Sequence, residues 1–204
     1  MNINFNEDEV DALREFMNVA IGSATSNIAD LLDAFATIHI PKITICNSEE
    51  LIKIVSSSIT EESNYHVIKQ LFAGKFGGES MFVMKDESSR NLGNHLYDIT
   101  NPSHDDITDA VMELTNILTS TVISKLTHDF GTQVQFFVPS SQYLNSANIV
   151  SYEDIKDYSK IIIISTVLDF QDQKIDGFIF ILTKDEAILR LKELINIKLE
   201  ELYS

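Results

Sequence analysis

Residues 11–18 read DALREFMN, and residues 109–116 read DAVMELTN. Both stretches have an aspartate first, a glutamate fifth and an asparagine eighth. At about 100° per residue, these three positions fall within a band of roughly 60° on one side of a helix. The apolar residues fall on the other side. Each stretch therefore predicts an amphipathic helix whose Asp, Glu and Asn face outward.

Working outward from these stretches, the chain repeats itself. A proline follows each asparagine at the same distance, as Pro41 and Pro139, so the whole pattern recurs at an offset of 98 positions. Further along, Gly78 recurs as Gly177 with an identical Lys-Asp-Glu tripeptide after it, at an offset of 99. Fixed offsets over this length predict two copies of one unit.

Both units, about 6–98 and about 103–204, predict the same order of elements. Each has a long helix, a strand, a β-hairpin and a closing helix, and a short helix can follow the strand. We therefore expect an α/β fold: one layered domain over residues 1–204 with an internal pseudo-two-fold repeat, not two independent domains. The two long helices would pack on a mostly antiparallel sheet.

The expected ranges in the first unit are a helix over 7–35, a strand over Thr37–Cys46, a short helix over Asn47–Val55, a hairpin of 66–73 and 79–85, and a helix over 86–97. In the second unit they are a helix over 104–128, a strand over Thr132–Val138, a short helix around Glu153, a hairpin of 161–170 and 177–183, and a helix from Lys184.

The composition excludes several classes of function. A net charge of −16 argues against nucleic-acid binding, which needs clustered Lys and Arg, and favours a protein partner. Cys46 is the only cysteine, so neither a disulfide within the chain nor a cysteine-based zinc site is expected. No apolar run approaches the roughly 20 residues that span a bilayer. The first residues lack the pattern of a secretory signal, so we expect a cytoplasmic protein with no membrane contact. The scattered histidines predict no metal site; they are His39, His66, His95, His104 and His128.

Exposed acids on one helix usually form only a solvated surface. Asparagine is harder to explain, because it costs roughly half a kcal/mol relative to alanine inside a helix. This chain places it there twice, as Asn18 and Asn116, each three residues after a glutamate. One turn further on, Gly22 and Ser120 are small enough to let another molecule approach closely. Pro41 and Pro139 are expected to be structural, fixing φ where a strand begins or ends.

The pattern Asp-x3-Glu-x2-Asn-x22-Pro resembles the signature of the CheC–CheX–FliY family of response-regulator phosphatases. This chain carries it at 11-15-18-41 and again at 109-113-116-139. A CheX-like member would be shorter with one intact motif, and a FliY-like member would continue into a flagellar-switch domain. Two intact motifs in about 200 residues therefore resemble the CheC branch.

The resemblance implies a substrate and roles for the motif residues. The substrate would be the aspartyl phosphate of a chemotaxis response regulator of the CheY type, which supplies its own Mg²⁺; the chain itself would need no cofactor. Asn18 and Asn116 would orient the attacking water, and Glu15 and Glu113 would pair with a cationic side chain of the partner. Asp11 and Asp109 are more peripheral acids that suit the helix dipole and can also touch the partner.

Two alternatives stay open beside the phosphatase. The chain could bind the phosphorylated regulator, or another signalling protein, without hydrolysing it. It could also regulate the receptor deamidase CheD, with which CheC-like proteins are associated. The region 140–157, where the two units differ most, is the candidate for such docking.

Overall fold

The computed structural model describes residues 5–35, 37–39, 41–59, 62–150, 155, 161–170, 172–184 and 186–203. The helices are α1 (Glu7–Leu32), α2 (Ser48–Ser58), α3 (Asp86–Tyr97), α4 (His104–Asp129) and α6 (Glu186–Tyr203), with a 3₁₀ turn η1 (Ser146–Asn148). The strands are β1 (Thr37–Ile38), β2 (Lys42–Cys46), β3 (Asn64–Gly74), β4 (Gly78–Lys85), β5 (Val134–Phe136), β6 (Ser140–Asn145), β7 (Ile161–Phe170) and β8 (Ile175–Lys184). The expected α/β class is confirmed, and among the described residues the long helices, the hairpins and the closing helices follow the expected order.

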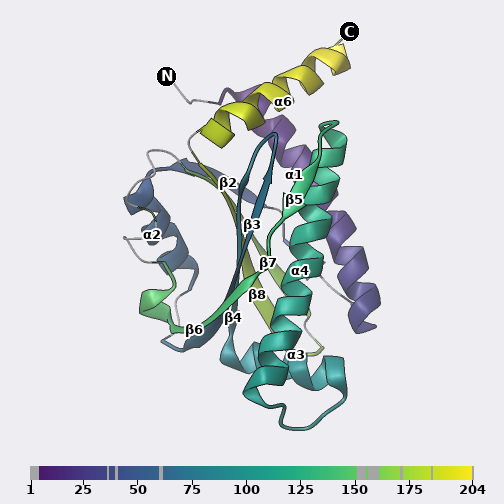
Figure 1. Cartoon of the computed structure of the whole chain (residues 1–204), viewed down its shortest axis with the longest axis vertical. Coiled ribbons are helices and arrows are strands. Elements are labelled where there is room, and N and C mark those ends of the chain that lie inside the picture. Colours follow the sequence, from purple (N-terminus) through teal and green to yellow (C-terminus); the bar gives the residue numbers. More distant parts are fainter. Residues whose placement is uncertain are drawn as a thin grey trace.

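All eight described strands form one antiparallel sheet in the order β1-β7-β8-β4-β3-β5, with β2 also on β7 and β6 also on β3. The helices α1 and α4 cover one face of the sheet and α2 lies on the other (Figure 1). At the two ends of this layered body, α6 packs against α1 and α3 packs against α4 (Figure 1). The sheet is therefore the middle layer of the molecule.

Strand pairing follows the same register in the two halves of the sheet. In one half, Ile38 pairs with Leu168 and Lys42 pairs with Ser165. In the other half, the corresponding pairs are Phe136 with Phe72 and Ser140 with Lys69. In the middle of the sheet, Met81 lies opposite Phe180, the position 99 residues further along the chain. This register lets any position of β3 be compared with the position 96 residues later in β7.

The two recurring glycines, Gly78 and Gly177, are required for the same physical reason: neither position has space for a Cβ atom. A Cβ atom on Gly78 would stand 2.4 Å from the carbonyl oxygen of Leu182 and 2.7 Å from the Phe72 ring. On Gly177 it would stand 2.5 Å from the Phe82 ring. All three distances are too short for any side chain, so the central strands can approach only where glycine stands.

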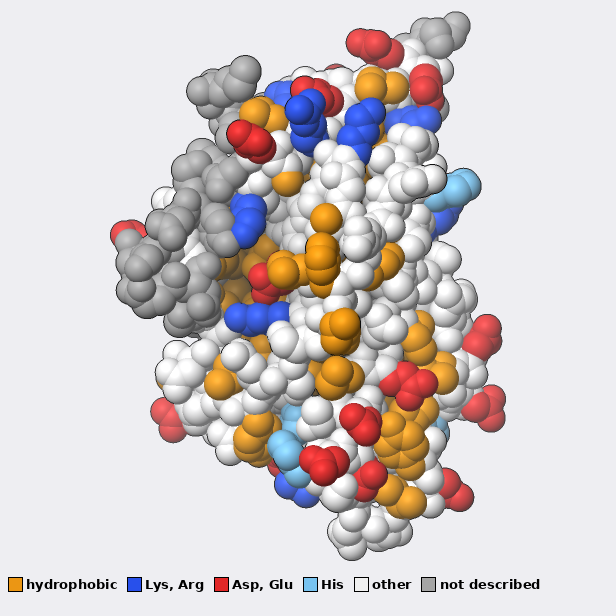
Figure 2. Space-filling model, viewed as in Figure 1, with side chains coloured by type: hydrophobic (Ala, Val, Ile, Leu, Met, Phe, Trp, Pro, Cys, Tyr) orange, Lys and Arg blue, Asp and Glu red, His pale blue; other side chains and the backbone are white. Residues whose placement is uncertain are grey.

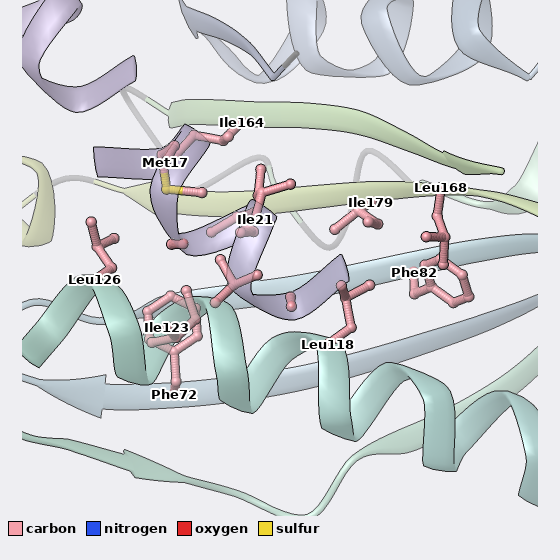
Figure 3. Close-up of a cluster of buried hydrophobic side chains, with 14 of the residues drawn as sticks. Met17, Ile21, Phe72, Phe82, Leu118, Ile123, Leu126, Ile164, Leu168 and Ile179 are labelled. Carbon is pink, nitrogen blue, oxygen red and sulfur yellow. The ribbon is translucent and has the colours of Figure 1, made fainter. Parts of the chain in front are cut away.

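The larger core lies between the sheet and the two long helices. Met17 and Ile21 of α1 and Leu118 and Ile123 of α4 belong to this core together with residues of the sheet, of which Phe72, Phe82, Ile164, Leu168 and Ile179 are labelled in Figure 3. A second cluster lies between the other face and α2, and includes the buried Cys46. The run 161–164 supplies both clusters in alternation, which explains why it is apolar throughout.

Several expected boundaries were wrong. α1 ends at Leu32, so Phe35 lies outside it and is 83% exposed, and Leu31 lies on the outer side of the helix. The expected strand over Thr37–Cys46 is two strands, because Pro41 stands immediately before β2; Pro139 likewise stands immediately before β6. Both prolines thus stand at the start of a strand, as predicted.

The region 140–157 is more regular than expected in its first part. Residues 140–145 form β6, for which the sequence predicts no element, and β6 pairs with β3 as β2 pairs with β7. Asn145 also caps the turn that follows it through the Ala147 amide, as Asn47 caps α2. The short helix expected around Glu153 lies outside the described residues.

Candidate functional site

The two motif helices begin at capping boxes, which fix where each helix starts. The Asn6 side chain accepts from the Glu9 amide while the Glu9 carboxylate accepts from the Asn6 amide. Ser103 and Asp106 form the same reciprocal pair at the start of α4. The two acids and the amide of each motif therefore lie in the first half of a helix with a defined beginning.

The two helices pack against each other in antiparallel orientation. Phe16 near the start of α1 meets Phe130 after the end of α4, with ring centroids 4.9 Å apart. Further along, the Asn27 amide donates to the Thr121 hydroxyl across 3.2 Å. Residues 18 and 116 are therefore displaced in opposite directions from the middle of the pair, about 20 Å apart along the helix axes at 1.5 Å per residue. The structure holds two separate motif surfaces, not one combined site.

The first motif is Asp11, Glu15 and Asn18 on α1. Asp11 and Glu15 are exposed and Asn18 is half-buried. Asp11 pairs with Arg14 at 2.5 Å, and this pair is exposed on both sides. Among the described residues the Asn18 side chain has no hydrogen-bond partner. The predicted outward direction of the two acids is confirmed, and the amide lies at the edge of the buried layer.

The second motif is Asp109, Glu113 and Asn116 on α4, and all three residues are exposed. Figure 2 shows acidic side chains gathered beside apolar ones over the end of the molecule where α4 begins. Tyr97, the last residue of α3, lies among these acids. Burial, together with the charges of Glu113, Asp109 and Asp106, raises the pKa of Tyr97. This surface is acidic with an aromatic ring at its side.

Asn116 differs from Asn18 in having a partner beneath it. Its Oδ1 accepts a hydrogen bond of 3.0 Å from Nε2 of Gln70 in β3, although the two residues lie 46 positions apart. The same Gln70 amide donates to the backbone carbonyl of Phe137, at 3.2 Å. Gln70 is only 2% exposed. Sequence reasoning missed it, and the available signal was a polar residue on the helix-facing side of β3, between Ile68 and Phe72.

The two small residues one turn after the amides lie in different surroundings. Gly22 is exposed, and a Cβ atom there would meet nothing within 4 Å. Ser120 is half-buried and its hydroxyl donates to the Ile117 carbonyl at 3.2 Å. Packing within the chain therefore does not require a glycine at position 22.

Two histidines that are far apart in the sequence, His66 and His104, lie next to each other in the structure. His66 is 1% exposed, its ring lies 5.4 Å from that of His104 and 4.9 Å from that of Tyr143, and neither ring nitrogen has a hydrogen-bond partner. Burial lowers the pKa of His66 to about 4; the charges of His104 and Arg90 add to this and that of Asp86 opposes it. His66 is therefore neutral at pH 7.

Within the described residues, no three His, Cys, Asp or Glu side chains come together in a way that would hold a metal ion. None of the described helices has the length and apolar character needed to cross a bilayer.

No protein-family profile and no curated protein matches this sequence. Solved structures do match its fold. FliY from Thermotoga maritima is 13% identical with a TM-score of 0.75, over 95% of this chain and 98% of that one. CheX from Desulfovibrio desulfuricans is 10% identical with a TM-score of 0.55, over 84% and 99%. The FliM middle domain from H. pylori is 11% identical with a TM-score of 0.60, over 93% and 99%. The chain therefore has the CheC-type α/β fold that the motif spacing led us to expect.

Proposed function

We propose that this chain is a chemotaxis phosphatase that removes the phosphoryl group from the aspartyl phosphate of a CheY-like response regulator. The observation that carries the proposal is the placement of the motifs. Twice, on the outer side of a well-capped helix, an exposed glutamate is followed one turn later by an asparagine that a partner can reach. A helix surface suits this substrate, because the bond to be broken lies in a pocket of another protein.

The chemistry asks little of the phosphatase beyond positioning. Water attacks phosphorus in line with the acyl oxygen, the new P–O bond forms, and the bond to the aspartyl oxygen breaks to give a carboxylate and inorganic phosphate. The Mg²⁺ ion belongs to the response regulator. The amides of Asn18 and Asn116 can accept from the attacking water through oxygen and donate to a phosphoryl oxygen through nitrogen. Holding the water in line lowers the entropy cost of the reaction without any change of protonation.

The acids of each motif would orient the partner protein on the motif surface. Glu15 and Glu113 would each pair with a lysine near the phosphorylation site of the partner, and Asp109 adds a second negative charge beside Glu113. A net charge of −16 supports recognition of a cationic surface and speeds association at low ionic strength. We infer a cytoplasmic location from the substrate, since response regulators act there.

The test is the decay of a purified, phosphorylated CheY-like receiver domain with Mg²⁺. We expect the wild type to accelerate decay, Asn18→Ala and Asn116→Ala each to remove part of the acceleration, and the double variant to remove nearly all of it. Asn94→Ala is the matched control, because Asn94 is an exposed helical asparagine outside both motifs. Full acceleration by the double variant would contradict the assignment.

The same assay separates the second candidate, an adaptor that binds the phosphorylated regulator without hydrolysing it. The capped, outward-facing helices would serve binding equally well, and only the paired amides favour catalysis. Complex formation with no change in the decay rate would establish the adaptor. Regulation of CheD is a further proposal from the resemblance, tested by adding this chain to a CheD deamidase assay.

A further inference from the structure

The hydrogen bonds beneath Asn116 form a short relay whose direction is fixed. At its inner end is the backbone carbonyl of Phe137, which can only accept. The Gln70 amide nitrogen must therefore face it, and the second N–H of that nitrogen points to Asn116. The Asn116 oxygen must in turn face Gln70. The relay leaves the Asn116 nitrogen directed away from Gln70.

The equivalent place beneath Asn18 contains a different side chain. The register of the sheet puts Thr166 where Gln70 stands on the other side, and the carbonyl of His39 where that of Phe137 stands. The Thr166 hydroxyl donates to the His39 carbonyl. A hydroxyl has one hydrogen, so this bond uses the only donor that Thr166 has. Thr166 therefore has no donor left for Asn18.

We propose that Gln70 is a positioning residue that holds the Asn116 carboxamide ready for catalysis, and that the second motif is in consequence the more active of the two. This inference rests on the proposed phosphatase function. One lone pair of the Asn116 oxygen accepts from Gln70 and the other stays available to the attacking water. The nitrogen is presented to a phosphoryl oxygen. At the first motif the partner must order the Asn18 amide itself, which costs conformational entropy at each encounter.

The activity test isolates one motif at a time. In an Asn18→Ala background, Gln70→Met keeps the length of the side chain and removes its donors. We expect kcat to fall about tenfold with KM unchanged, because docking through Glu113 is intact and only the orientation of the amide is lost. The matched control is Thr166→Val in an Asn116→Ala background, where the remaining activity should be unchanged. Urea unfolding at the assay temperature checks that both variants are folded.

A second measurement does not depend on activity. Side-chain NH₂ signals in ¹⁵N NMR spectra, assigned by their loss in the two Asn→Ala variants, report how ordered each amide is. We expect the Asn116 nitrogen to be nearly as rigid as the backbone, Asn18 to be more mobile, and Gln70→Met to bring Asn116 to the level of Asn18.

The outcomes are distinguishable. If Asn116→Ala leaves the decay rate unchanged while the amide order measured by NMR follows the prediction, the phosphatase role of this motif is overturned. The hydrogen bond by which Gln70 orders Asn116 is then supported on its own. If Asn116→Ala removes activity but Gln70→Met changes neither kcat nor the order of Asn116, the positioning role of Gln70 is overturned. A rise in KM with constant kcat would also overturn it, since that result places Gln70 in docking.

Discussion

The first and second motifs carry the same three residue types on the same fold, yet the molecule supports them differently. In the first, Arg14 neutralises Asp11 and none of the described side chains fixes Asn18. In the second, Asp109 stands beside Tyr97 in an acidic surface, and Gln70 fixes Asn116. The position of Arg14 is occupied by a methionine on α4. The same three residue types in the same arrangement therefore do not make two sites equivalent, because the neighbouring residues determine the charge of each site and the orientation of its amide.

The same asymmetry extends into the interior. Glu9 is 2% exposed and lies where the apolar Ile107 stands on α4. His66 is 1% exposed and lies where the apolar Ile162 stands in β7. Each side of the molecule thus buries an ionisable group at a place where the other buries isoleucine. Isoleucine is therefore an informative substitution for Glu9 and for His66, because the corresponding position elsewhere in the chain already buries an isoleucine.

The largest stability effect is expected at the buried acid of α1. Burial raises the pKa of Glu9, but hydrogen bonds from the Asn6 amide, Asn196 and Lys192 outweigh this and lower it. Lys192 lies 3.1 Å from the carboxylate and joins α6 to α1. Lys192→Met should reduce the free energy of unfolding by about 2 kcal/mol, below the usual cost of breaking a buried pair because the lysine is partly solvated.

Urea unfolding at pH 7 measures this loss. The double variant Glu9→Ile with Lys192→Met should recover part of it, since it copies the apolar Ile107 but loses the capping bond from the Asn6 amide and the bond from Asn196. If Lys192→Met alone unfolds within about 0.5 kcal/mol of the wild type, α6 is not held by this pair.

A smaller effect, dependent on pH, is expected at His66. Its folded pKa of about 4 lies below the ordinary value of 6.5, so between these pH values the unfolded chain binds more protons than the folded one. Stability from this residue is therefore complete above pH 6.5 and is lost as the pH falls towards 4. Between pH 7 and pH 5 the wild type should lose about 1–2 kcal/mol more unfolding free energy than His66→Ile. Paired urea titrations measure the difference.

His128→Gln is the control for that experiment, because His128 is exposed near the far end of α4. It should keep the pH dependence of the wild type. A His66→Ile variant with the same acid loss as the wild type would show that the buried imidazole is not the group responsible.

The smallest effect is expected at Arg14. Arg14→Met should change the free energy of unfolding by less than about 0.5 kcal/mol, because the Asp11 pair is exposed. It should nevertheless make the first motif as acidic as the second. In an Asn116→Ala background we expect about a twofold lower KM for the phosphorylated receiver domain at low salt, fading as salt is raised. An unchanged KM at every salt concentration would show that this charge takes no part in docking.

Much of the fold was readable from sequence because its signals are local. Capping residues, helical periodicity and glycines at hairpins act over a few positions, so α1, α3 and α4 and both hairpins were predicted almost to their ends. Pro139 was correctly placed at a strand boundary, but the strand β6 that follows it was missed. Its exposed, polar residues carry no periodic signal, and it is a strand only because β3 offers an edge to pair with.

By itself the sequence determined the two amphipathic helices and the residues on their outer sides, since helix geometry converts spacing directly into direction. Only the tertiary structure decided what lies beneath and beside those residues. Gln70 meets Asn116, and His66 meets His104, through packing of α4 and its first turn on β3, and no local pattern records such distant pairs. The reason is physical: a hydrogen bond or ring contact between segments far apart depends on register and helix packing, which the whole core sets together.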